Sequence, residues 1–137
     1  MDDLNVLLCD DSDDVRSKLS NLLNKCGVKQ VYQLTDGSDV IDFLIQNFSD
    51  ESKRVNLLIT DYIMQEKDGL TLVKEIREFS SKEKELETYI QKLPIIVATA
   101  EGETNSMLSF VEAGVNTYIL KPCDKITLIE KIKIALG

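Results

Sequence analysis

Short apolar runs alternate along this chain with longer stretches in which apolar residues recur at helical spacing. Five runs rich in β-branched residues are typical of buried strands, and they lie at residues 6–9, 31–34, 55–60, 95–98 and 117–120. A near-continuous apolar strand is buried on both faces, as in parallel sheets. The alternation therefore predicts five β-α units, an α/β fold in which helices cover both faces of a parallel sheet.

Apolar residues three and four positions apart predict five helices between and after these strands. Their apolar positions are Val15, Leu19, Leu22, Leu23 and Cys26; Val40, Ile41, Leu44 and Ile45; Leu70, Val73, Ile76 and Phe79; Met107, Phe110, Val111 and Ala113; and Ile126, Ile129, Ile132 and Leu136. Gly27 and Gly114 follow the first and fourth helices as natural C-caps. Ser38 is in place to cap the second helix.

One stretch does not fit the alternation. Residues 80–92 are highly charged and precede the fourth strand. We expect this stretch to extend the third helix and then to form an exposed connection.

Length and composition limit the classes of protein that the chain can represent. A chain of 137 residues suits a single domain over residues 1–137, and a net charge of −8 argues against direct binding to a nucleic-acid backbone. No apolar stretch is long enough to span a bilayer, and the acidic N-terminus does not resemble a signal peptide. Three cysteines without a close pair are typical of a reducing compartment, so we expect a cytoplasmic protein without membrane insertion.

The chain contains no histidine. This excludes histidine as a general base, histidine-ligated zinc and a Ser-His-Asp triad.

Charged residues follow three of the predicted strands at the point where each strand ends. Asp10-Asp11 come directly after the first apolar run, Asp61 after the third, and Lys121-Pro122 after the fifth. The carboxyl ends of parallel strands meet at one edge of the sheet, where open α/β sheets bind their ligands. We therefore expect these side chains to converge on a single site.

A cluster of Asp10, Asp11 and Asp61 requires a proton or a cation. Two carboxylates about 4 Å apart repel each other by roughly 4 kcal/mol at an effective dielectric constant near 20. All the candidate ligands are oxygen atoms, which favours a hard divalent cation over zinc or copper. Mg²⁺ is the expected ion, because it needs few protein ligands and keeps water molecules that a phosphate can replace.

Lys121 and Thr99 complete a set of groups suited to phosphoryl transfer. Thr99 ends the fourth strand, so its hydroxyl is expected at the same edge as the Lys121 ammonium. The cation and Lys121 would neutralise charge on the transferred group, and Thr99 would donate a hydrogen bond to it. Asp61 would be the nucleophile, and the product would be an aspartyl phosphate.

A series of short motifs lies at the predicted strand ends and turns, in the order Asp10-Asp11, Leu57-Leu58-Ile59-Thr60-Asp61, Asp68-Gly69, Thr99-Ala100-Glu101, Tyr118 and Lys121-Pro122. Together they resemble the receiver domain of bacterial two-component response regulators, the CheY-like fold. The resemblance covers essentially the whole chain. It implies a flavodoxin-like (βα)5 three-layer sandwich with a parallel sheet in the order 2-1-3-4-5. In this family the Lys-Pro bond is usually cis.

The resemblance also implies a metal site. Asp61 would accept the phosphoryl group and would bind Mg²⁺ directly together with Asp11. Asp10 would contribute through water, and the backbone carbonyl of Ile63 would be a further ligand.

A switch between two states is implied as well. Thr99 and Lys121 would contact the phosphoryl group, Thr99 would be drawn inward, and Tyr118 would move into the space that it leaves. This would remodel the face formed by the fourth predicted helix, the fifth strand and the last helix, which family members name α4-β5-α5.

Because the chain has no histidine, the phosphoryl donor would be a histidine kinase or a histidine phosphotransfer protein. The protein would assist only its own phosphorylation and dephosphorylation and would turn over no small molecule. The chain ends soon after the last helix, so we expect its output to be binding to a downstream protein or relay of the phosphoryl group. A monomer and a phosphorylation-dependent dimer both fit the sequence.

One alternative from another class of protein is open at this stage. Asp11-Ser12-Asp13-Asp14-Val15 resembles the D-x-D-x-V signature of haloacid-dehalogenase-type phosphatases. Asp11 would then be the nucleophile and Asp13 the general acid of a true hydrolase. The late acidic pair expected to hold the metal in those enzymes is missing, and only Asp124 lies near the corresponding place.

Overall fold

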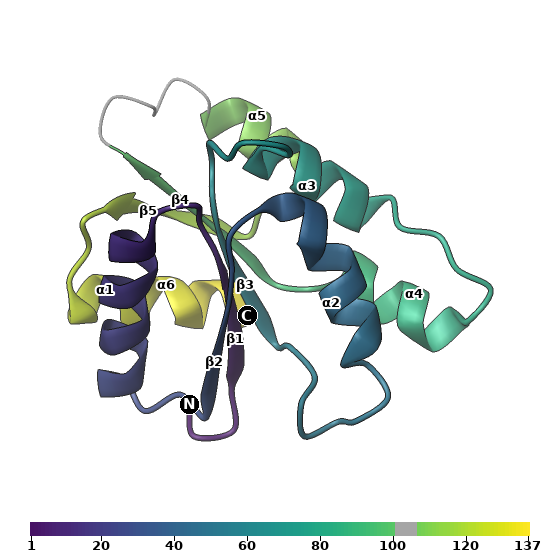
Figure 1. Cartoon of the computed structure of the whole chain (residues 1–137), viewed down its shortest axis with the longest axis horizontal. Coiled ribbons are helices and arrows are strands. Elements are labelled where there is room, and N and C mark those ends of the chain that lie inside the picture. The colour runs from purple at the N-terminus through teal and green to yellow at the C-terminus, as the bar shows by residue number, and fades with distance from the viewer. Residues whose placement is uncertain (101–106) are drawn as a thin grey trace.

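The computed structural model describes residues 1–100 and 107–137. A five-stranded parallel sheet in the order β2-β1-β3-β4-β5 forms its centre, and helices cover both faces (Figure 1). The strands are β1 (Asn5–Cys9), β2 (Gln30–Leu34), β3 (Leu57–Asp61), β4 (Ile95–Ala100) and β5 (Thr117–Lys121). The predicted α/β class, the parallel sheet and the strand order are confirmed.

The helices are α1 (Asp13–Lys25), α2 (Val40–Gln46), α3 (Gly69–Arg77), α4 (Lys84–Gln91), α5 (Met107–Ala113) and α6 (Lys125–Leu136), with a short 3-10 turn η1 (Gly37–Asp39) before α2. Helices α1 and α6 share one face of the sheet, and α2, α3, α4 and α5 share the other (Figure 1). Among the described residues, no helix is long and apolar enough to cross a membrane.

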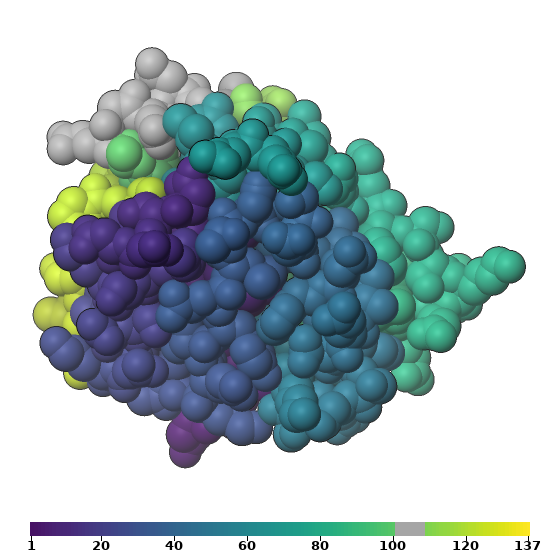
Figure 2. Space-filling model, viewed as in Figure 1, coloured from purple at the N-terminus to yellow at the C-terminus, as the bar shows by residue number. Residues whose placement is uncertain are grey.

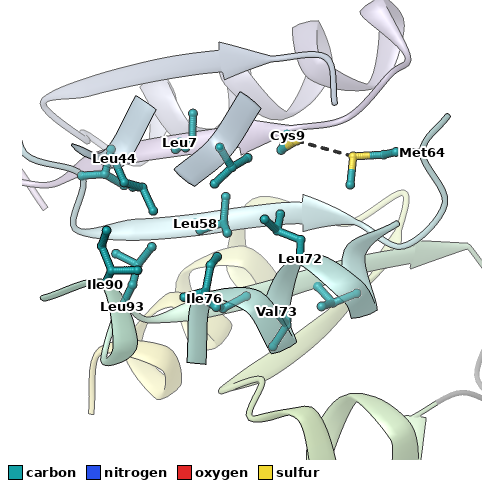
Figure 3. Packing of buried hydrophobic residues seen from close by; sticks show 14 of the residues in the cluster. Leu7, Cys9, Leu44, Leu58, Met64, Leu72, Val73, Ile76, Ile90 and Leu93 are labelled. Atoms are coloured by element: carbon teal, nitrogen blue, oxygen red, sulfur yellow. Dashed lines mark hydrogen bonds between the residues drawn. The ribbon is translucent and has the colours of Figure 1, made fainter. Parts of the chain in front are cut away.

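Successive side chains along each central strand point to opposite faces of the sheet and pack into two separate cores. Leu7 and Leu58 point into the larger core beneath α2 to α5, and Leu8 and Ile59 into the smaller core beneath α1 and α6. Figure 3 shows the larger core, where the Cys9 thiol lies 3.4 Å from the Met64 sulfur. Burial is the main cause that raises the pKa of the Cys9 thiol, to about 12, so Cys9 is a packing residue.

The expectation for the charged stretch 80–92 was wrong. Helix α3 ends at Arg77, and a separate helix, α4, occupies residues 84–91. Its Leu86 and Ile90 are buried one turn apart in the larger core, and the Tyr89 hydroxyl donates to the Val55 carbonyl at 2.6 Å. The high charge of the stretch hid this narrow apolar face.

Two further details of the helix predictions need correction. Ser38 lies inside η1 and does not cap α2, whose first turn begins after Asp39. Helix α6 buries Leu128, Ile132 and Ala135, whereas Ile126 is 71% exposed. Because α6 is apolar on several sides, its spacing is compatible with more than one buried stripe.

Arg77 joins three elements at the edge of the sheet where β4 begins. Its guanidinium donates to the carbonyls of Gln91, Leu93 and Gly114 at 2.7–2.9 Å and to the Asn116 side chain at 3.0 Å. Burial lowers the pKa of Arg77. The ends of α3, α4 and α5 are thus fixed to one another by a single side chain.

Candidate functional site

Three carboxylates meet at the carboxyl edge of the sheet. Cys9 pairs with Thr60 in the β1–β3 ladder, so the residues that follow them, Asp10 and Asp61, lie side by side. One carboxylate oxygen from each of Asp10, Asp11 and Asp61 lies within 4.8 Å of the others. Asp10 and Asp61 are buried and Asp11 is exposed. The predicted convergence of these residues is confirmed.

Lys121 supplies positive charge to this cluster from the last residue of β5. Its ammonium nitrogen lies 2.8 Å from Asp61 Oδ1 and 3.3 Å from Asp10 Oδ2. The following Lys121–Pro122 bond is cis, as the family resemblance implied.

The charges of the cluster shift the pKa values of its members. Burial raises the pKa of Asp61 and the Asp10 charge adds to this, and together they outweigh the opposing effect of Lys121. For Lys121, burial opposes the charged form, but the hydrogen bond and charge of Asp61, together with Asp10, raise its pKa overall. The folded protein thus disfavours the charged form of Asp61 and favours the charged form of Lys121.

A close contact between the start of α3 and the end of β3 positions Asp61. A Cβ atom on Gly69 would lie 2.3 Å from the Asp61 carbonyl oxygen, so the contact requires glycine. The Gly69 amide donates to the Tyr62 carbonyl at 2.7 Å, and the Tyr62 amide donates to Asp61 Oδ1 at 2.8 Å. Asp68 caps α3 by accepting from the Thr71 amide at 2.8 Å. The Asp68-Gly69 motif thus fixes the start of α3 against the end of β3.

Of the remaining predicted residues, Thr99 lies near the carboxyl edge of the sheet, whereas Tyr118 is the second residue of β5. Thr99 is buried and lies one position beyond Ala98, the β4 partner of Asp61. Tyr118 pairs with Val97, and the Lys131 ammonium lies 4.8 Å from the centre of its ring. Ile63 is 58% exposed. Glu101 lies outside the described residues.

Comparison with known proteins agrees with this geometry. The family model for the response regulator receiver domain matches residues 6–133. The chain is 36% identical to a chemotaxis protein CheY homolog of Campylobacter jejuni, over 98% of this chain and 93% of that protein. It is 33% identical to chemotaxis protein CheY1 of Helicobacter pylori, over 98% of both chains. The chain belongs to the response regulator receiver domain family.

Solved structures show the same fold. A crystal structure of a response regulator from Chloroflexus aurantiacus superposes with a TM-score of 0.81 at 28% identity, over 97% of both chains. Chemotaxis protein CheY4 of Vibrio cholerae superposes with a TM-score of 0.76 at 22% identity, over 97% of this chain and 98% of that chain. The flavodoxin-like arrangement expected for a receiver domain is confirmed, and the family is one of signalling phosphoacceptors.

The phosphatase alternative is not favoured. The receiver family accounts for nearly the whole chain. The Asp13 side chain, the proposed general acid of the phosphatase, is 93% exposed and forms an ion pair with Arg16.

Arg16 has a role in this receiver domain that the sequence patterns did not indicate. Arg16 is buried, and its guanidinium donates to the Asp10 carbonyl at 2.6 Å and to the Gln33 side chain at 3.3 Å. Asp10 itself accepts from the Ser12 amide at 2.9 Å. An arginine in the first turn of a helix that follows an acidic loop is the signal that could have identified it.

The donor set of the cluster fits a hard divalent cation. The three carboxylates offer only oxygen atoms, and one lysine cannot neutralise three negative charges. The roles of the individual residues as ligands stay a prediction.

Proposed function

We propose that this receiver domain accepts a phosphoryl group on Asp61 with the help of Mg²⁺. The observation that carries the proposal is the position of Asp61, which is buried, 2.8 Å from the Lys121 ammonium and within 4.8 Å of Asp10 and Asp11. Burial raises the pKa of Asp61, so the folded protein favours a bound cation or a proton there.

Four residues would hold the metal. Asp11 and Asp61 would bind Mg²⁺ directly, the Ile63 carbonyl would be a further ligand, and Asp10 would contribute through water. When bound, Mg²⁺ would neutralise charge on the phosphoryl oxygens.

The chain's own residues would perform the transfer. A carboxylate oxygen of Asp61 would attack phosphorus as the bond to the donor's histidine nitrogen breaks, and the electron pair of that bond would return to the imidazole. Lys121 would move the hydrogen bond that it donates to Asp61 to a phosphoryl oxygen, and the hydroxyl of Thr99 would donate to another. The cation and the lysine offset the negative charge that otherwise resists the attack.

Phosphorylation would switch the face formed by α5, β5 and α6. Thr99 would move toward the phosphoryl group, and Tyr118 would follow it inward. Tyr118 would then lose its cation–π contact with Lys131. Such a contact contributes about 0.5–1 kcal/mol at an exposed site. This small cost suits a switch whose two states differ by a few kcal/mol.

The donor would be a histidine kinase or a histidine phosphotransfer protein, because this chain contains no histidine. The CheY relatives support a chemotaxis-type regulator. Its output would be binding to another protein or transfer of the phosphoryl group onward. We take residues 1–137 as one receiver domain in the cytoplasm, either monomeric or dimeric when phosphorylated. It would bind no nucleic acid directly and would turn over no small molecule.

Labelling with acetyl phosphate tests the proposal. The parent protein and Asp13→Asn are expected to take up label in the presence of Mg²⁺, and Asp61→Asn is expected to take up none. Asp13→Asn is the matched control, because it removes a carboxylate that the phosphatase mechanism needs and the receiver mechanism does not. Label that persists in Asp61→Asn, or that is lost in Asp13→Asn, would contradict the proposal.

A further inference from the structure

The loop that follows Asp61, residues 62–68, packs into the core through a single buried side chain. Met64 is its buried side chain, and it packs against Cys9 in the larger core (Figure 3). Gln65 and Glu66, which come next, are exposed, and Lys67 is only half-buried. The core therefore holds the loop at one point, and the orientation of the peptide groups on either side of Met64, the Ile63 carbonyl among them, depends on further contacts.

Asp36 contacts the second half of this loop from the neighbouring turn after β2. Its Oδ2 accepts a hydrogen bond from the Glu66 amide and its Oδ1 accepts one from the Lys67 amide, both at 3.1 Å. Ser38 adds a hydrogen bond to the Glu66 side chain at 3.2 Å. One carboxylate thus binds two consecutive backbone amides of the loop across 30 positions in the sequence.

Gly37 shows independently that the two segments are in close contact. A Cβ atom on Gly37 would lie 2.9 Å from the Lys67 carbonyl oxygen and 3.3 Å from the terminal carbon of Met64. A larger residue would push the loop away from the turn. The sequence Asp36-Gly37 therefore supplies both the acceptor and the space that this contact requires.

We propose that Asp36 is a positioning residue for the metal site. By fixing residues 66 and 67, it holds the loop in the conformation that presents the Ile63 carbonyl to the cation. Asp36 is not one of the three clustered carboxylates, and both of its oxygens accept hydrogen bonds from the loop. The inference rests on the proposed function, because it concerns the affinity of the same site for Mg²⁺.

A pair of single-residue variants separates positioning from charge. Asp36 and Asp39 line one hollow of about 340 Å³ together with Asp11, so Asp36→Ala and Asp39→Ala each remove one negative charge from the same place. Asp39 forms no side-chain hydrogen bond at the start of α2. Tyrosine fluorescence during a Mg²⁺ titration is expected to show about tenfold weaker binding for Asp36→Ala and less than a twofold change for Asp39→Ala.

Two further measurements distinguish this role from a loss of stability. Hydrogen exchange at the amides of residues 66 and 67 is expected to speed up in Asp36→Ala and not in Asp39→Ala. At saturating Mg²⁺, the rate of labelling by acetyl phosphate is expected to return to within about twofold of the parent. If Asp36→Ala folds poorly in urea titrations, Asp36→Asn, which keeps one acceptor, is expected to show an intermediate loss of affinity.

Equal Mg²⁺ affinities for Asp36→Ala and Asp39→Ala would overturn the inference, as would a labelling defect that persists at saturating Mg²⁺. Failure of the proposed function looks different. In that case the parent binds Mg²⁺ no better than Asp61→Asn does.

Discussion

Replacing Asp61 by asparagine is expected to make the magnesium-free protein more stable. Asp61 lies within 4.8 Å of two other carboxylates and is buried, and its pKa is raised accordingly. Asparagine has nearly the same shape and removes only the charge. The Asp61 carboxylate thus lowers the stability of the fold, and replacing it with a neutral side chain should raise that stability.

The size of the effect follows from the distances. At an effective dielectric constant near 20, each repulsion at 4.8 Å is about 3.5 kcal/mol, so Asp10 and Asp11 together contribute about 7 kcal/mol. The attraction of the Lys121 ammonium, 2.8 Å from Asp61 Oδ1, offsets about 6 kcal/mol of this repulsion. Solvent weakens the share of the exposed Asp11, whereas burial of Asp61 adds a cost of its own. We expect a net gain of about 1 kcal/mol in the free energy of unfolding for Asp61→Asn.

Urea unfolding followed by circular dichroism measures this gain, with Asp3→Asn, an exposed change near the N-terminus, as the control for charge. Mg²⁺ at a hundred times its dissociation constant is expected to stabilise the parent by about 2.7 kcal/mol and Asp61→Asn by much less. Because the folded-state pKa of Asp61 is raised, the parent loses stability as the pH rises from about 3.9 through that pKa. The advantage of Asp61→Asn should therefore shrink as the pH falls toward 4. A less stable Asp61→Asn at neutral pH would refute the reasoning.

Three other substitutions test separate parts of the structure. Lys121→Met leaves Asp10 and Asp61 without their cation, so it is expected to cost about 3 kcal/mol of unfolding free energy, part of which Mg²⁺ restores in the same urea assay. Gly69→Ala places a carbon against the Asp61 carbonyl and should lower stability by about 3 kcal/mol in thermal unfolding; a loss below about 0.5 kcal/mol would contradict the close contact. Arg77→Met removes four hydrogen bonds far from the cluster and should cost about 3 kcal/mol, while acetyl phosphate labelling of the folded protein stays within about twofold of the parent.

The residues at the strand ends could be predicted because the signal is local. An apolar run that stops at a charged residue marks both a buried strand and the edge where it ends, as for Asp61 in β3 and Lys121 in β5. The regular alternation of strands and helices then predicted a parallel sheet, and the order of the motifs along the chain indicated the family.

The parts that were missed depend on contacts between distant segments. Asp36 contacts a loop 30 positions away, and the role of Arg16 depends on a backbone carbonyl and on Gln33 in β2. Helix α4 is stabilised by Leu86 and Ile90. Their burial depends on contacts with the larger core and not on the charge of their neighbours in the sequence. Spacing within one segment carries no information about such partners.

The position of α4 has a consequence for how receiver domains diversify. Helix α4 follows α3 in the chain, and this segment lies at the periphery of the molecule (Figure 1 and Figure 2). Arg77 donates hydrogen bonds to the carbonyls of Gln91 and Leu93, between the end of α4 and the start of β4, and so helps to fix the position at which β4 enters the sheet. An evolving lineage can thus lengthen, recharge or recruit this segment for a new contact while its phosphorylation chemistry is inherited unchanged.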